Sequence, residues 1–116
     1  MKIKVSSFSK EAATKSKGLV LREEIEKGLH TADEINVDFS DINRFASPFF
    51  NNSFAALALK YGFDRIEKIS CLNLSDVGLD AYESSMENAK MLSSSPEFAA
   101  KMTMITILPQ IGRAHV

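Results

Sequence analysis

Asp38 and Asp41 form the first pair of side chains in this sequence that could do chemistry, because they flank the end of an alternating apolar stretch. Polar groups at the carboxyl ends of strands commonly build the sites of α/β proteins. Two carboxylates could hold magnesium or serve a small hydrolase or phosphotransferase. The pattern supplies no phosphate loop and no third ligand, so we predict neither a metal site nor a catalytic residue here.

A second polar cluster, Thr14-Lys15-Ser16-Lys17-Gly18, lies where a helix is expected to start. Hydroxyl, amine and backbone N–H groups at a helix start can bind phosphate. The cluster lacks the earlier glycine and the Gly-Lys-Ser/Thr order of a nucleotide-binding loop, so a solvated polar turn is the favoured interpretation. The alternative is a nucleotide- or small-ligand-binding module that uses Thr14, Ser16, Lys17 and Asp38 at the strand ends.

His30 and Cys71 are the remaining residues that could do chemistry, because the second histidine, His115, lies in the segment 111–116 that we leave out of functional reasoning. A hydrolytic triad needs a nucleophile, a base and an orienting acid, whereas His30 is better explained by a favourable contact with the dipole at a helix end. Cys71 is the only cysteine, which excludes an internal disulfide and a cysteine zinc cluster. Its apolar neighbours predict a buried structural thiol. We therefore expect no cofactor.

The composition is that of one small globular domain. The 116 residues are 45% hydrophobic and 25% charged, which is enough for a core without disulfides or metal. The formal net charge of -1 gives no field that would attract nucleic acid or anionic lipid. No apolar run approaches the roughly 18 residues of a membrane span, and the N-terminal Met-Lys-Ile-Lys-Val reads as a strand rather than a signal peptide. These features predict a cytoplasmic protein with no nucleic-acid or membrane partner, and they leave the oligomeric state open.

The periodicity of apolar residues predicts the order β-α-β-α-β-α. The strands are expected around 3–5, 35–39 and 66–74. The first helix begins between Ser9 and Gly18 and ends near Leu29, and the third follows a cap at Ser75-Asp76. Connections of this length are crossovers, whose right-handed sense gives a mostly parallel sheet with helices packed on it. The expected fold class is therefore a layered α/β domain.

The rest of the chain is expected to pack around the segment from Ile35 to Gly62. After its strand, Ser47 is predicted to cap a helix that has Pro48 in its first turn. One continuous helix would carry an inward stripe and end at Gly62. The stripe consists of Phe50, Phe54, Leu57 and Tyr61.

The C-terminal part is expected to differ from the domain. Ser93-Ser94-Ser95-Pro96 should break the third helix, and a short helix is predicted from Glu97 to about Met104. Residues 111–116, Ile-Gly-Arg-Ala-His-Val, match the translation of a widely used sequencing adapter, so we expect read-through there and leave the natural C-terminus open. The predicted organisation is a domain at 1–92, a helical extension at 93–110 and adapter-derived sequence at 111–116.

Two short motifs carry a family resemblance: Asp38-Phe39-Ser40-Asp41-Ile42 and Ser47-Pro48-Phe49-Phe50-Asn51-Asn52. The chain resembles the STAS-like domain family of unassigned function in three features. These are a strand ending in Asp-Phe, an Ile three residues on, and a Ser/Pro turn leading into a Phe-x-Asn-Glu-like helix. Asn52 replaces the usual acidic residue. That family is related to the sulfate-transporter and anti-sigma-factor-antagonist domains. The third strand also fits, so the resemblance covers roughly residues 1–92.

The resemblance implies a prokaryotic or phage regulatory module that binds a protein and is not an enzyme. In anti-sigma-factor antagonists the corresponding loop carries Asp-Ser-Ser-Gly, and a kinase-like partner phosphorylates the second serine. Here the phosphoserine position falls on Pro48, and Ser47 supplies the adjacent hydroxyl. A capping role for Ser47 is favoured over its phosphorylation. We expect docking of a histidine-kinase-like ATPase or another signalling partner through Phe45, Ser47, Phe49, Asn51, Asn52 and Ser53.

Overall fold

The structure is a computed structural model that describes residues 1–94. Its helices and strands follow one another as β1 (Lys2–Lys4), the 3-10 turn η1 (Val5–Ser7), α1 (Lys15–Thr31), β2 (Asn36–Asp38), α2 (Ser47–Asn51), α3 (Phe54–Tyr61), α4 (Phe63–Glu67), β3 (Ser70–Leu72) and α5 (Asp76–Ser94). The predicted alternation of strands and helices is confirmed.

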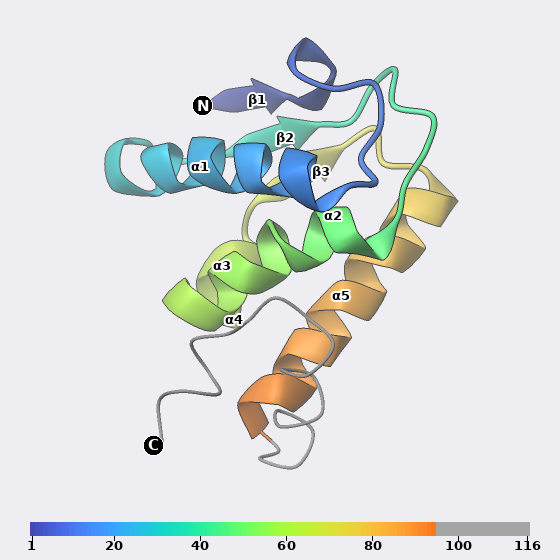
Figure 1. The fold of residues 1–116 in the computed structure, drawn as a ribbon. Coiled ribbons are helices and arrows are strands. Elements are labelled where there is room, and N and C mark those ends of the chain that lie inside the picture. The colour runs from blue at the N-terminus through green and yellow to red at the C-terminus, as the bar shows by residue number, and fades with distance from the viewer. Residues whose placement is uncertain (95–116) are drawn as a thin grey trace.

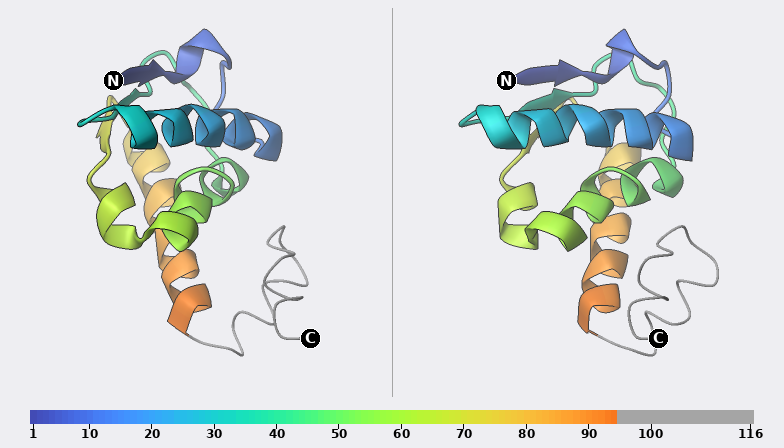
Figure 2. Two further views of the ribbon diagram at one scale, coloured as in Figure 1. Left: turned by 90° about the vertical axis from the view of Figure 1, so that its left-hand side faces the viewer. Right: turned by 60° about the vertical axis from the view of Figure 1, so that its left-hand side comes forward.

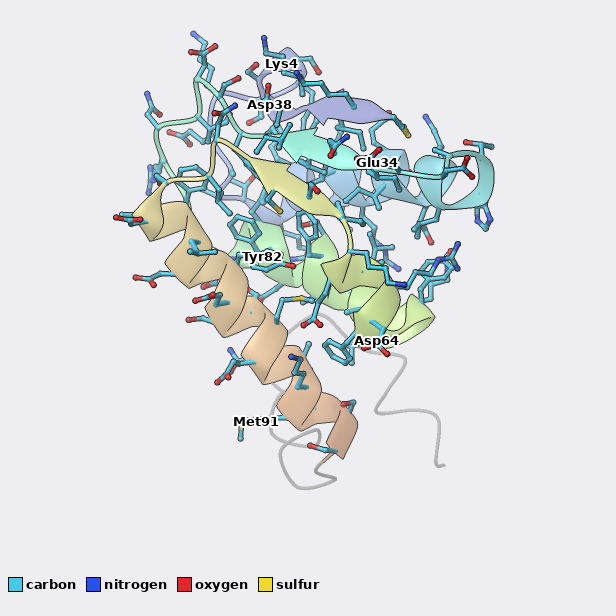
Figure 3. The ribbon with its side chains drawn as sticks, turned by 180° about the vertical axis from the view of Figure 1, so that it is seen from behind. Lys4, Glu34, Asp38, Asp64, Tyr82 and Met91 are labelled. Atoms are coloured by element: carbon cyan, nitrogen blue, oxygen red, sulfur yellow. The ribbon has the colours of Figure 1, made fainter. Side chains whose placement is uncertain are left out.

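The three strands form a parallel sheet in the order β1-β2-β3. Because spatial order follows chain order, right-handed crossovers place every connecting helix on the same face. Figure 1 shows α1 in front of the strands, and Figure 3, seen from behind, shows the strands with no helix over them. The predicted layered α/β fold is therefore confirmed.

The side chains of the sheet alternate between a covered and an uncovered face. Ile3, Val37 and Cys71 share one row and point toward the helices. The uncovered face is mostly polar, which explains why a parallel sheet tolerates water on this side when such sheets are usually covered on both. It carries Lys2, Lys4, Asn36, Asp38, Ser70 and Leu72.

The helices form a second layer that packs closely on itself. A Cβ added to Gly18 of α1 would lie 2.5 Å from the carbonyl oxygen of Phe49 in α2, so glycine allows these two helices to touch through their backbones. α5 then packs across α2 and α3. Figure 2 shows α5 crossing these helices and leading away from the strands.

Several local predictions hold and others do not. Ser75 accepts a hydrogen bond from the Gly78 backbone N–H at 3.2 Å, as expected of a cap, and Gly62 ends α3 with a φ of 104°. The predicted continuous helix is wrong, because it is broken between Asn51 and Phe54. The strand predicted around 66–74 is shorter than expected, because the helix α4 reaches Glu67 and β3 covers only Ser70–Leu72.

Two further findings concern the C-terminal extension and the membrane. The helix predicted between Glu97 and Met104 lies outside the described residues. Across residues 1–94 the structure contains no helix that combines the length and the apolar character needed to cross a bilayer.

Candidate functional site

The segment predicted to dock a partner is largely part of the core. Phe49, Asn52 and Ser53 are each at most 3% exposed. These three side chains therefore lie inside the fold, and their contact with a partner stays a prediction. Phe45, Ser47 and Asn51 remain partly exposed, so the contacts that could reach a partner are fewer than the sequence suggested.

The burial of Phe49 follows from the position of α2. This short helix packs against α1 on one flank and α5 on the other, so two adjacent phenylalanines both find apolar surroundings. The rings of Phe49 and Phe50 meet edge to face with centroids 5.2 Å apart. Aromatic pairs in this arrangement add stability beyond the area they bury. The same cluster extends to Phe39, Phe45, Phe54 and Tyr82.

Ser47 does not have the predicted capping role. It is the first residue of α2, the N-cap position belongs to Ala46, and no side chain caps this helix. The Ser47 carbonyl accepts a hydrogen bond from the Ser85 hydroxyl of α5 at 3.4 Å. The Ser47 hydroxyl is thus free of the cap contact, and its phosphorylation stays a prediction.

Asn52 and Ser53 break the helix and hold the break in place. The Asn52 amide donates to the Pro48 carbonyl at 2.7 Å, and the Ser53 hydroxyl donates to the Phe49 carbonyl at 2.8 Å. Side chains that bond back to carbonyls four residues earlier compete with the helical ladder. The Asn52 Oδ1 atom is buried and has no partner in the described part of the chain.

Asp38, the last residue of β2, contacts both neighbouring strands. Its Oδ1 atom accepts hydrogen bonds from the Asn73 amide after β3 and from the Ser40 backbone N–H, both at 2.9 Å. Its Oδ2 atom lies 3.7 Å from the Lys2 ammonium in β1. These contacts, the Asn73 hydrogen bond first, lower the pKa of Asp38 to about 2. The carboxylate is buried and committed to the protein, so it serves as a structural link.

Asp41 does not join Asp38 in a cation site. Asp41 lies in the turn after β2 with a φ of 64°, and Asn73 has a φ of 60° in the turn after β3. Both residue types tolerate this left-handed backbone better than others. No group of three His, Cys, Asp or Glu side chains suited to a metal ion occurs among residues 1–94.

The polar cluster at the start of α1 is occupied by local hydrogen bonds. Thr14 is the N-cap, and its hydroxyl accepts from the Lys17 backbone N–H at 3.3 Å. The same hydroxyl lies 3.3 Å from that of Ser16. The Lys17 ammonium donates to the Phe8 carbonyl at 3.1 Å, which ties the incoming loop to the helix. A ligand at this cluster stays a prediction.

An apolar surface that the sequence analysis missed lies at the carboxyl end of the sheet. Gly78 packs on the Phe45 ring and on Leu74, at 2.9 Å and 2.6 Å from where its Cβ would be. Its neighbour Val77 is 65% exposed, the highest fraction among the large apolar residues described. We call Arg44, Phe45, Leu74 and Val77 the carboxyl-end surface. The signal was present in the sequence, because Val77 stands off the inward stripe of α5.

A family comparison matches residues 17–78, which run from the first turn of α1 to the first turn of α5. The matching family is described as the STAS-like domain of unknown function (DUF4325). The chain belongs to this family. The match covers more than half of the chain, and it confirms the resemblance inferred from the two motifs. No curated protein and no solved structure matches the chain.

In this STAS-like domain, the matched region holds Asp38, all four residues of the carboxyl-end surface and every ring of the aromatic cluster except that of Tyr82. β1 lies outside the match. The two sequence motifs that carried the resemblance are thus mainly motifs of the core and of the strand-end turn. They identify the fold, whereas a functional surface has to be sought among the accessible residues around them.

Proposed function

We propose that this STAS-like domain is a non-enzymatic regulatory module that docks a signalling protein, with a histidine-kinase-like ATPase as the partner class. Docking takes place at the carboxyl-end surface, together with the accessible residues Ser47 and Asn51 that remain from the predicted set. Domains related to this family are often regulatory protein-interaction modules, which supports the class of function. The specific partner is part of the proposal.

The exposure of Val77 is the observation that carries the proposal. A large apolar side chain that is 65% exposed gains by being covered. Next to it in the chain, Gly78 packs on the half-buried Phe45 and Leu74, and Arg44, which precedes Phe45, is exposed and lies 3.9 Å from the Glu11 carboxylate. Interface centres typically combine aromatic and aliphatic side chains with a polar rim. The committed hydrogen bonds of Asp38 further support a binding role over a catalytic one.

The test compares two aspartate substitutions on the same helix. The candidate partner is a purified histidine-kinase-like ATPase from the same genome, and binding is measured by titration calorimetry. Val77→Asp should weaken binding at least about tenfold, as for a central interface residue. Met91→Asp, at the far end of α5 and 48% exposed, should leave binding unchanged. Equal affinity of the two variants, or no binding of the wild-type domain, would refute the proposal.

The nucleotide-binding alternative has less support, because Thr14 and Lys17 already make hydrogen bonds within the protein. Thermal unfolding with and without ATP or GTP separates the two functions. A ligand present at 100 times its dissociation constant would stabilise the domain by about 2.7 kcal/mol. We expect no such shift.

A further inference from the structure

Among residues 1–94, the outer edge of β1 has backbone groups without a hydrogen-bond partner. The Asn36 N–H donates to the Met1 carbonyl, and residues that bond to a given neighbour alternate along a parallel strand. Met1 and Ile3 therefore pair with β2, whereas the backbone groups of Lys2 and Lys4 point away from the sheet. The Lys4 carbonyl accepts the Ser7 hydroxyl at 2.7 Å. This leaves the N–H and C=O of Lys2 and the N–H of Lys4 for an added strand.

A groove runs beside this edge, between β1 and α1. Its volume is about 340 Å³. Met1 is 43% exposed and Val20 is 36% exposed, so part of its apolar lining is accessible. The groove is lined by Met1, Lys2, Ile3, Lys4, Ser7, Phe8, Val20 and Glu24. An extended chain that paired with β1 would lay every second side chain on this lining.

The charges at the edge distinguish between possible occupants. The side chains of Lys2 and Lys4 stand on the uncovered face (Figure 3 labels Lys4). Two copies of β1 paired with each other would bring these lysines together, and like charges opposite one another are destabilising. Lysine on an edge strand is also a common way to prevent such self-pairing. A segment with acidic side chains on the same face would instead be attracted.

We propose that the β1 edge binds an extended acidic segment of a partner protein as a fourth parallel or antiparallel strand. The segment alternates acidic and apolar residues. Its acidic side chains lie beside Lys2 and Lys4, and its apolar side chains enter the groove against Val20. This site is separate from the carboxyl-end surface and lies outside the family match, so it does not depend on the proposed function.

The first experiment uses an acetylated heptapeptide of alternating glutamate and valine, titrated into the ¹⁵N-labelled protein. Its controls are the alternating lysine–valine heptapeptide and a peptide with the same glutamates and valines in two blocks. We expect amide shifts at Lys2, Lys4 and around Val20, and binding that weakens as salt rises. The two control peptides should bind at least about tenfold more weakly.

The second experiment uses matched charge reversals. Lys4→Glu should weaken the glutamate–valine peptide by about five- to tenfold, which is the sum of a lost attraction and a new repulsion at an exposed site. Lys68→Glu, an exposed reversal after α4, should leave binding unchanged, and circular dichroism should show both variants folded. Three results would each overturn the proposal: equal binding of all peptides, shifts that map elsewhere, or no shifts at about 1 mM peptide. A concentration-dependent dimer that loses its contact in Lys4→Glu would assign the edge to a second copy and overturn it too.

Discussion

Replacing Gly18 with alanine should destabilise this domain, although alanine is the better helix former. Inside a helix the change from glycine to alanine favours folding by about 1 kcal/mol. The new Cβ, however, would lie 2.5 Å from the Phe49 carbonyl oxygen and 3.2 Å from the Asn52 Cβ. A backbone carbonyl cannot rotate away, so α1 and α2 must separate. Overpacking of this kind costs about 1–3 kcal/mol, and the upper part of that range applies here. The expected net loss is about 1–2 kcal/mol.

Gly28→Ala is the matched control on the same helix. Its Cβ would also meet an atom at 2.5 Å, but that atom is the Sδ of Met1, at the end of a flexible side chain, with the Ile35 Cδ1 at 3.0 Å. The same helix preference is gained while Met1 can move into solvent. We expect stability within about 1 kcal/mol of the wild type.

Urea unfolding followed by circular dichroism measures both variants, and thermal unfolding gives a second readout. A loss of 1–2 kcal/mol should lower the Tm of Gly18→Ala by about 5–15 °C for a domain of this size. The reasoning would be refuted if Gly18→Ala proved as stable as Gly28→Ala or more stable. That result would mean that the two helices can separate at no cost.

Three further predictions follow from single contacts. Asp38 has a pKa of about 2 in the folded protein against an ordinary 3.8, so the unfolded chain binds the proton first and stability should fall as pH drops from about 5 toward 2. Asp38→Asn should flatten that part of the acid unfolding curve. An unchanged curve would contradict the hydrogen bond between Asp38 and Asn73 as a stabilising link. Thr14→Ala should lower the free energy of unfolding by about 1 kcal/mol because Thr14 caps α1. Ser47→Ala should lower it by less than about 0.5 kcal/mol because the Ser47 side chain caps no helix. Equal losses of the two variants in urea unfolding would argue against this assignment of the caps. Burial raises the pKa of the Cys71 thiol to about 12, so a thiol reagent at neutral pH should label the native protein far more slowly than the protein in urea, and equal rates would show an accessible thiolate.

The order of the elements could be predicted because its signals are local. Apolar spacing placed the strands and helices, Ser75 carried a cap that its neighbours could satisfy, and Gly62 ended a helix. Such features depend on a few adjacent residues. The family match followed from the same local motifs.

The site could not be predicted as well, because burial there depends on packing between distant segments. Phe49 stands off the stripe of a continuous helix, so the sequence placed it on the surface. The break at Asn52 and Ser53, together with α1 and α5 on either side of α2, buries it instead. Likewise Asp38 looked like a ligand until Asn73 and Lys2, both far away in the sequence, were found on its two oxygens.

The rings of Phe45, Phe50 and Tyr82 connect the accessible rim of the domain to its interior. A molecule that binds Phe45 at the rim therefore contacts the first of three rings in series, the last of which, Tyr82, belongs to α5. Binding at Phe45 would slow hydrogen exchange of backbone amides in α2 and α5, including amides that the bound molecule does not contact. Hydrogen exchange could thus report binding at this rim without any label on either protein.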